Sequence, residues 1–224
     1  MPFGPQGLYR AIPRLVWQSA PQVERVLALA PPGARIVDLG AGGRQITPDT
    51  VCVDFLRLAS TDVIGDVTRL PFRDASADLV YATGLLEHVV DERAVLAEMA
   101  RILKPGGIAH VEVPFLEQYH DDPIDVRRMT VPGLALALEA QGFEVVAKGP
   151  HIGPTVTLLN TWARWWAFVF DGPSLPARAA SMGAFVLCSV VAWPFKFLDV
   201  FLIRKRQAHT LAMGVYCTAR KKSG

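Results

Sequence analysis

Short apolar strands alternate with helices over residues 21–150, and this alternation constrains the fold more than any other feature of the sequence. Strands are expected at Arg35–Leu39, Val51–Phe55, Thr61–Ile64, Ala77–Ala82, Ile108–Val113, Phe143–Ala147 and Leu211–Ala219. Helices are expected at Gln22–Ala30, Asp91–Leu103 and Val131–Gln141, the second of which ends at the turn Lys104-Pro105-Gly106-Gly107. The alternation predicts an α/β fold with a mostly parallel sheet and helices on both faces.

The first strand runs into a glycine turn, Asp38-Leu39-Gly40-Ala41-Gly42-Gly43. Ligands of such sheets bind beyond the carboxyl ends of the strands, and glycines let the backbone approach them closely. The turn is not a dinucleotide-binding fingerprint, because Gln45 stands where a third glycine is required. The carboxylate of Asp38 would also repel a pyrophosphate. It suits a positively charged ligand such as S-adenosylmethionine, which has an ammonium, a sulfonium and no phosphate.

Two further acids follow strands. Asp54 ends the second strand, where a carboxylate can accept hydrogen bonds from both hydroxyls of a ribose. Asp66 follows the third, where it can accept from an adenine amino group while Val67 lies against the ring. Taken singly, each acid is more simply a capping, solvated or loop residue. Their order along the chain makes them informative.

That order includes further segments: Leu70-Pro71-Phe72, Ala77-Asp78-Leu79-Val80, Leu86-Glu87-His88-Val89 and Leu103-Lys104-Pro105-Gly106-Gly107. Together with the three acidic sites it resembles the class I S-adenosylmethionine-dependent methyltransferase family, in particular the small ubiquinone- and glycan-type enzymes. The resemblance covers about residues 22–150 and the last strand. It implies a Rossmann-like seven-stranded sheet whose last strand is antiparallel.

The resemblance also implies roles for individual residues. Asp38, Gly40 and Gly42 would hold the methionine part of S-adenosylmethionine, Asp54 the ribose, and Asp66 with Val67 the adenine. Thr83-Gly84 would face the cofactor after the fourth strand, and Ala41 and Phe55 complete the predicted cofactor site.

Two features depart from the family pattern. Arg44 stands where a third glycine is common, and the segment between the first two strands is too short for the usual first helix. We therefore expect the carboxylate of the cofactor to be held differently, with Arg44 itself as the candidate.

A polar loop follows the fifth strand, where an acceptor would lie, and its pattern His120-Asp121-x-Pro…Asp-x-Arg-Arg-x-Thr is similar to methyltransferases of glycan and cell-surface polymer genes. His120 and Asp121 are the predicted catalytic residues, with His88 as a third candidate. The unperturbed pKa of histidine suits a general base at neutral pH. The alternative for His120 is a structural role. For His88, a structural role or a position beside the cofactor is the simpler interpretation. Since the sulfonium is already activated, positioning alone can drive methyl transfer.

Residues 151–206 differ from the rest of the chain in composition. Five aromatic side chains lie within Leu158–Phe170, Ala179–Phe195 carries no charge, and Arg204-Lys205-Arg206 is basic. We interpret this segment as an apolar helical insertion at a membrane surface. A packed subdomain or a homodimer interface is the alternative. If Leu211–Ala219 rejoins the sheet, both ends of the insertion lie on one side of the membrane, which excludes a single crossing. The insertion then lies on the surface, dips in as a re-entrant hairpin, or crosses twice.

The expected organisation is an N-terminal arm (1–20), a methyltransferase core (21–150), the insertion (151–206), and a last strand with a basic tail (207–224). The formal charge of +2 gives no reason to expect nucleic acid. Cys52, Cys188 and Cys217 form no metal-ligand spacing, so no metal is expected, and free thiols indicate a reducing, cytoplasmic compartment. We expect a protein peripheral to the inner face of the membrane.

The leading functional hypothesis is methylation of a hydroxyl on a glycan or lipid-linked acceptor. The alternatives are a quinone-type small-molecule methyltransferase and a non-catalytic, cofactor-binding scaffold at the membrane.

Overall fold

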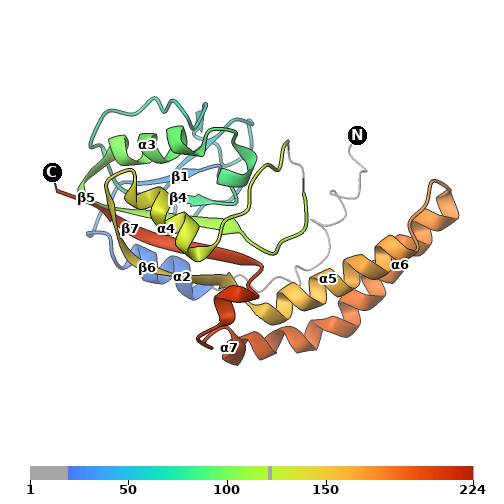
Figure 1. Cartoon of the computed structure of the whole chain (residues 1–224). Coiled ribbons are helices and arrows are strands. Elements are labelled where there is room, and N and C mark those ends of the chain that lie inside the picture. The colour runs from blue at the N-terminus through green and yellow to red at the C-terminus, as the bar shows by residue number, and fades with distance from the viewer. Residues whose placement is uncertain (1–19, 121–122, 224) are drawn as a thin grey trace. The chain divides into compact units, whose positions relative to one another are not determined.

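The computed structural model describes residues 20–120 and 123–223 (Figure 1). The chain divides into two compact units. One contains residues 20–151 and 214–223, and the other contains Ile152–Met213. The expected arm lies outside the described residues except for residue 20, which begins the first described helix.

The first unit is built on a seven-stranded sheet of order β3-β2-β1-β4-β5-β7-β6. The strands are β1 (Ile36–Leu39), β2 (Val51–Asp54), β3 (Val63–Ile64), β4 (Ala77–Thr83), β5 (Leu103–Pro114), β6 (Phe143–Ile152) and β7 (Gly214–Lys221). Strands β3, β2, β1, β4 and β5 pair in parallel, and β7 pairs antiparallel with β5. The order reverses beside β1, so the crevice at that switch point lies at the carboxyl ends of β1 and β4.

Helices cover both faces of this sheet (Figure 1). Helices α3 (Glu92–Ile102) and α4 (Val131–Glu139) lie on one face, and α2 (Ala20–Leu27) lies on the other. Asp91 caps α3 by accepting from the backbone N–H of Ala94, and Thr130 caps α4 through Gly133. Under α2, Val26 packs on Ile36, Leu79, Tyr81 and Ile108. The structure thus has helices on both faces of one sheet, as the alternation of strands and helices predicted.

The element boundaries shift by a few residues, with one informative difference. The expected turn Lys104–Gly107 belongs to the start of β5 and bulges out of the ladder: Ala77 pairs with Leu103, but Leu79 already pairs with Ile108. Gly106 has a φ of +77°, and a Cβ on Gly107 would lie 2.9 Å from the carbonyl oxygen of Lys104. Both glycines are therefore required by the bulge.

Between β1 and β2 the described chain contains turns and no helix, as the short spacing predicted. The backbone N–H groups of Gly40 and Ala41 instead donate to the carbonyl of Val53, at 2.9 and 3.2 Å. The glycine turn is therefore held against β2 by backbone hydrogen bonds.

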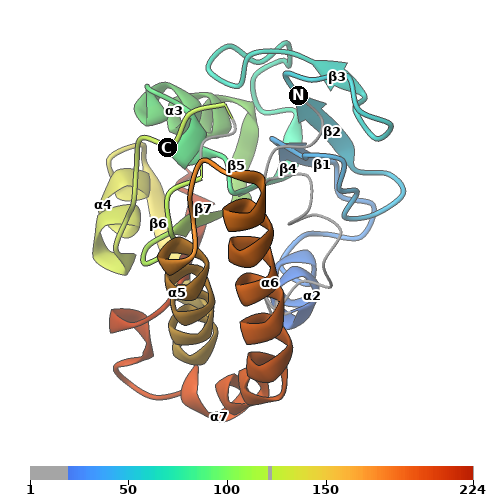
Figure 2. The same cartoon turned by 90° about the vertical axis from the view of Figure 1, so that its right-hand side faces the viewer.

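The second unit is a helical hairpin. Helix α5 (Pro154–Val169) turns back into α6 (Leu175–Ala192), followed by η2 (Trp193–Leu198), α7 (Asp199–Leu202) and η3 (Ala208–Thr210). Figure 2 shows α5 and α6 side by side, with α7 at the foot of the hairpin. Ala163, Phe185 and Cys188 form the contact between the two long helices.

The foot of the hairpin is closed by Asp199. Its carboxylate accepts from the backbone N–H groups of Thr155 and Val156, at 2.8 and 3.0 Å, and so caps α5 from a residue more than 40 positions away. The N–H of Met213 donates to the carbonyl of Ile152 at 3.1 Å, which joins the two ends of the unit.

Many large apolar side chains of the hairpin are exposed. Phe168 is 76% exposed, Phe201 70% and Trp165 54%. Among the described residues, Leu175–Leu202 is a helical run of 28 residues that is long and apolar enough to span a membrane. Only 22% of its apolar stretch is buried within the protein.

A buried polar cluster lies at the carboxyl half of the sheet. The Oε1 atom of Glu112 lies 3.0 Å from His110 Nε2 and 3.1 Å from His151 Nδ1, and Tyr81 donates to it at 3.4 Å. Thr218 lies 2.8 Å from the other ring nitrogen of His110. Burial alone would raise the pKa of Glu112, but hydrogen bonds from His110 and His151 outweigh it and hold that pKa well below its usual range. The ionised carboxylate is thus part of the folded core.

The sign of this shift predicts how stability depends on pH. A lowered pKa in the folded state stabilises the protein above the unfolded-state pKa of glutamate, about 4.3, and the stabilisation is lost as the pH falls below it. Glu112→Gln should lower the free energy of unfolding by about 1.5–3 kcal/mol at pH 7, the worth of hydrogen bonds to a charged group. The difference from wild type should shrink below about pH 4.

Urea unfolding between pH 3 and 8 measures this difference, with Glu144→Gln on an exposed side chain as the control. A penalty for Glu112→Gln that is the same at every pH would contradict an ionised Glu112 in the core.

Candidate functional site

The glycine turn places Asp38 and Arg44 together at the carboxyl end of β1. Asp38 is fully buried, and Arg44 binds it through two nitrogens: Nη2 lies 2.8 and 2.9 Å from the two carboxylate oxygens, and Nε lies 3.1 Å from Oδ2. The Arg44 guanidinium also lies 5.4 Å from the Tyr81 ring centroid. Burial raises the pKa of Asp38, although Arg44 acts to lower it. Asp38 is therefore favoured in its ionised form only while a cation such as Arg44 lies beside it.

Glycine is required in the turn by space as well as by conformation. Gly40, Gly42 and Gly43 have φ values of +64°, +57° and +85°. A Cβ on Gly40 would lie 2.8 Å from Leu85 Cδ1, whereas one on Gly43 would meet nothing within 4 Å. Gly40 is thus fixed by packing, and Gly42 and Gly43 expose backbone that a ligand can approach. Ala41 is buried beneath them.

Asp54 connects the end of β2 to the glycine turn. Its Oδ2 accepts from the N–H of Gly42 and its Oδ1 from the N–H of Leu56, both at 2.9 Å. The side chain is only 5% exposed, and the neighbouring Phe55 is 61% exposed. Each carboxylate oxygen still has a second lone pair for a ligand hydroxyl.

Asp66 and Val67 follow β3. Asp66 is exposed, and its Oδ1 accepts from the N–H and the hydroxyl of Thr68, at 2.8 and 2.7 Å. These hydrogen bonds lower the pKa of Asp66. Thr83 and Gly84 end β4, where Gly84 has a φ of +63° and donates to the carbonyl of Glu112 at 3.1 Å. The predicted cofactor residues therefore all lie at the carboxyl edge of neighbouring strands.

Two arginines clamp the loop that follows β5. Arg127 donates to the carbonyls of Leu86 and Val89, at 2.9 and 2.8 Å. Arg128 forms an ion pair with Asp125 and donates to the carbonyls of Glu117 and Gln118, both at 3.1 Å. The loop is thereby held against η1 (Leu86–His88), the short helix that follows β4.

The clamp brings Glu87, His88 and His120 together. Glu87 Oε1 lies 3.9 Å from His88 Nε2 and 4.0 Å from His120 Nε2, and the two imidazole rings meet edge to face with centroids 5.2 Å apart. Glu87 is 2% exposed, and burial raises its pKa to about 7. A Cβ on Gly84 would lie 3.5 Å from Glu87 Oε1, so this cluster borders the predicted cofactor residues.

The structure thus unites two of the three predicted catalytic residues, His88 and His120. Asp121 lies outside the described residues. Glu87, Arg127 and Arg128 had no role expected from the sequence. The acid between Leu86 and His88, shortly after an apolar strand, was a signal for Glu87, and the Asp-x-Arg-Arg spacing was a signal for the two arginines.

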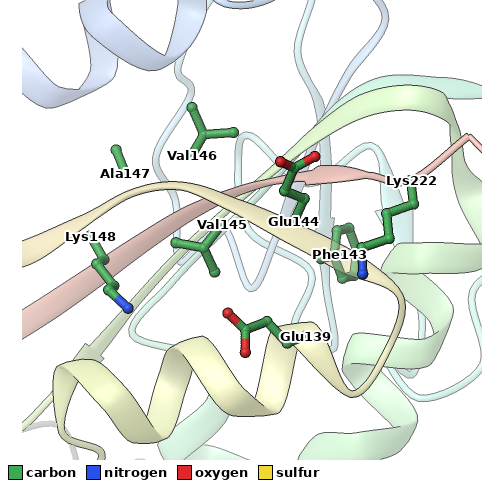
Figure 3. A pocket seen from close by; sticks show the side chains of 8 residues that line it. All are labelled: Glu139, Phe143, Glu144, Val145, Val146, Ala147, Lys148 and Lys222. Atoms are coloured by element: carbon green, nitrogen blue, oxygen red, sulfur yellow. The ribbon is translucent and has the colours of Figure 1, made fainter.

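A surface hollow elsewhere contains none of these residues. It is lined by Glu139, Phe143, Glu144, Val145, Val146, Ala147, Lys148 and Lys222 (Figure 3). The N–H of Lys222 donates to the carbonyl of Gly142 at the start of β6, and the end of β7 pairs with the start of β5. The hollow therefore lies near the amino ends of the parallel strands, away from the predicted site.

The strand order, the antiparallel β7 and the acids at the carboxyl edge define a Rossmann-like methyltransferase fold. Solved structures share it. A chain titled the [4+2]-cyclase SpnF has a TM-score of 0.59 and 20% identity, and the match covers 93% of this chain and 83% of that one. An S-adenosylmethionine-dependent methyltransferase from Mesorhizobium loti has a TM-score of 0.55 and 15% identity, covering 92% and 98%. At these identities the likeness concerns the fold alone.

Sequence comparison is more specific. Residues 37–111 match the family model described as a methyltransferase domain. Demethylmenaquinone methyltransferase of Mycobacterium sp. (strain KMS) is 41% identical over 91 residues, which cover 34% of this chain and 40% of that protein. The protein of the same name from Renibacterium salmoninarum is 39% identical over 95 residues, covering 35% and 40%.

Residues 37–111 are therefore a methyltransferase domain, and they lie within a Rossmann-like methyltransferase fold. The matched segment spans about two fifths of the length of these curated relatives.

Proposed function

We propose that this protein transfers the methyl group of S-adenosylmethionine to a small, lipid-soluble acceptor of the quinol type. The observation that carries the proposal is the match to demethylmenaquinone methyltransferases. The methyltransferase-domain match over residues 37–111 includes Asp38, Asp54 and Glu87. A hydroxyl on a lipid-linked glycan is the second candidate, supported by the pattern of the loop after β5. Methylation of a glycan hydroxyl releases the proton of that hydroxyl, and methylation of a quinol releases a proton from the ring carbon or the hydroxyl that accepts the methyl group.

The cofactor site fits the amino-acid end of S-adenosylmethionine in a specific way. That end is a zwitterion, and the Arg44–Asp38 pair offers the complementary charges. We expect the pair to open when the cofactor binds, so that Asp38 takes the ammonium and Arg44 takes the carboxylate. Arg44 is about one third exposed and can swing, whereas Asp38 is fixed in the core. When bound, the cofactor supplies an activated methyl group that needs only an aligned acceptor.

Arg44→Ala tests this arrangement. Losing hydrogen bonds to a charged group costs about 1.5–3 kcal/mol, so the affinity for S-adenosylmethionine should fall roughly 10- to 150-fold. The affinity for methylthioadenosine, which lacks the amino-acid part, should stay within about twofold. Asp54→Ala, which removes the predicted ribose contact, should weaken both ligands by about 1–3 kcal/mol. Calorimetry measures all four affinities.

Arg44→Lys keeps a positive charge beside Asp38 and controls for disruption of the turn. Tighter binding of S-adenosylmethionine to Arg44→Ala would mean that Arg44 only blocks Asp38 and never contacts the cofactor.

The acceptor side is the cluster of Glu87, His88 and His120. His120 is 31% exposed at its side chain and Glu87 only 3%, so an acceptor reaches the imidazole first. The carboxylate behind the ring favours departure of the acceptor proton toward this cluster. Because Gly84 adjoins Glu87, donor and acceptor would meet at the end of β4.

Labelled cofactor tests both the acceptor and the role of His120. Purified protein with methyl-labelled S-adenosylmethionine should label reduced demethylmenaquinone in preference to a lipid-linked glycan extract. His120→Ala should lower turnover by roughly 10²–10⁴-fold, the usual contribution of proton transfer, with cofactor affinity unchanged. The exposed His209→Ala serves as control.

Labelling of the glycan alone would transfer the proposal to the second candidate. Cofactor binding without labelling of any acceptor would support the scaffold hypothesis.

We further propose that the hairpin unit attaches the protein to the inner face of the cytoplasmic membrane. Support comes from its large exposed side chains, such as Phe168 and Phe201, and from exposed Arg204, Lys205 and Arg206 beside α7. A helix that is apolar on all sides needs cover from lipid or protein. Lipid fits this surface best, since the basic cluster would add about 1 kcal/mol per residue near anionic headgroups.

Vesicle flotation separates the two contributions. Charge reversal to Glu at Arg204, Lys205 and Arg206 should weaken binding to anionic vesicles, most strongly at low salt. Phe168→Gln with Phe201→Gln should weaken binding at every salt concentration, because the apolar part is not screened. Charge reversal at the exposed Arg57, Lys148 and Lys222 is the matched control. A protein that is monomeric and floats with no vesicle refutes membrane attachment, and a stable dimer assigns the surface to a subunit interface.

A further inference from the structure

We propose that Glu87, His88 and His120 form a binding site for a divalent transition metal of the zinc type. One ligand atom from each residue lies within 4.8 Å of the other two. Two histidines and one carboxylate are the ligand set of many catalytic zinc sites, which keep a further position open. This differs from the expectation from the sequence, which considered cysteine spacing and found no metal site.

The contacts of both histidines direct the same ring atom into the cluster. His88 Nδ1 is hydrogen-bonded to the carbonyl of Ile124, and His120 Nδ1 lies 3.1 Å from the carbonyl of Gln118. A carbonyl only accepts, so each Nδ1 carries the hydrogen and each Nε2 carries the lone pair. Both Nε2 atoms are the ones that face Glu87. Metal-binding histidines are oriented by this kind of outer contact.

The carboxylate is an independent indication. Glu87 Oε2 is buried and has no hydrogen-bond partner among the described residues. A buried carboxylate oxygen without a donor is costly unless a cation lies beside it. The distances from Glu87 Oε1 to the two Nε2 atoms, 3.9 and 4.0 Å, are too long for hydrogen bonds, so the histidines do not satisfy it directly.

The spacing fits a metal after a small closure. Ligand bonds of about 2.0–2.2 Å in a tetrahedral site place the ligand atoms roughly 3.3–3.6 Å apart. Side-chain rotations of His120, which is partly exposed, can supply the difference. Imidazole ligands favour zinc, iron, nickel or copper over magnesium or calcium.

Metal binding does not depend on the proposed methyl transfer. Only the role of the metal rests on that function: the acceptor oxygen would become its fourth ligand and release its proton to water more readily. His120 would then act as a ligand, and its loss would still lower turnover.

The test uses the full chain without S-adenosylmethionine, stripped with a chelator and then titrated with Zn²⁺ or Co²⁺. We expect one tightly bound ion per chain and visible Co²⁺ absorption typical of four-coordinate nitrogen and oxygen ligands. Glu87→Gln and His120→Ala should each weaken binding at least tenfold and reduce this absorption. His209→Ala should bind as wild type does. Competition with Fe²⁺ and Mg²⁺ identifies the class of metal.

Glu87→Gln replaces a buried carboxyl group with a neutral amide of nearly the same shape, so it should fold, and circular dichroism checks this. Equal affinities in wild type and Glu87→Gln, or no bound ion in a folded wild type, overturn the metal site. Metal binding by a protein that methylates nothing leaves the site intact and refutes the proposed function alone.

Discussion

Carboxylates buried at one edge of a parallel sheet must each be given hydrogen-bond donors or a cation, and this requirement organises the whole site. Asp38 is satisfied by Arg44, Asp54 by two backbone N–H groups, and Glu112 by two histidines and a tyrosine. Glu87 has no comparable set of donors. The four solutions correspond to different uses: a pair that can open for a zwitterion, a brace for the glycine turn, a fixed core cluster, and a carboxylate free to serve an acceptor or an ion.

The elements that could be predicted from the sequence are those that depend on local pattern. Apolar strands, capped helices and the glycine turn follow from short-range chemistry, and the expected α/β layers and antiparallel last strand are confirmed. Asp38 and Asp54 were expected to bind ligand because they lie at the carboxyl ends of strands. Their partners were only partly predictable. Arg44 was expected near the cofactor, but its bidentate pairing with Asp38 depends on how the turn folds back on itself.

Long-range contacts account for what was missed. Glu87 and His120 are 33 positions apart, and hydrogen bonds between distant residues, among them those of Arg127 and His88, bring their segments together. The predicted turn at Lys104–Gly107 proved to be a bulge, because the register of β4 against β5 is set by the core on either side of it. In the hairpin, the apolar composition was plain, but the cap that Asp199 provides to α5 could not be read from residues so far apart.

The hydrogen bond between Met213 and Ile152 has a topological consequence. The hairpin connects β6 to β7, which are neighbours in the sheet, and its two ends are hydrogen-bonded to each other. It therefore connects the two strands as a short β-turn would. Such a segment can be lengthened, exchanged or removed without changing the register of any strand. The sequences of the sheet and of the hairpin can therefore change independently in evolution. Exchange of the hairpin alone could direct proteins with the same sheet to different surfaces.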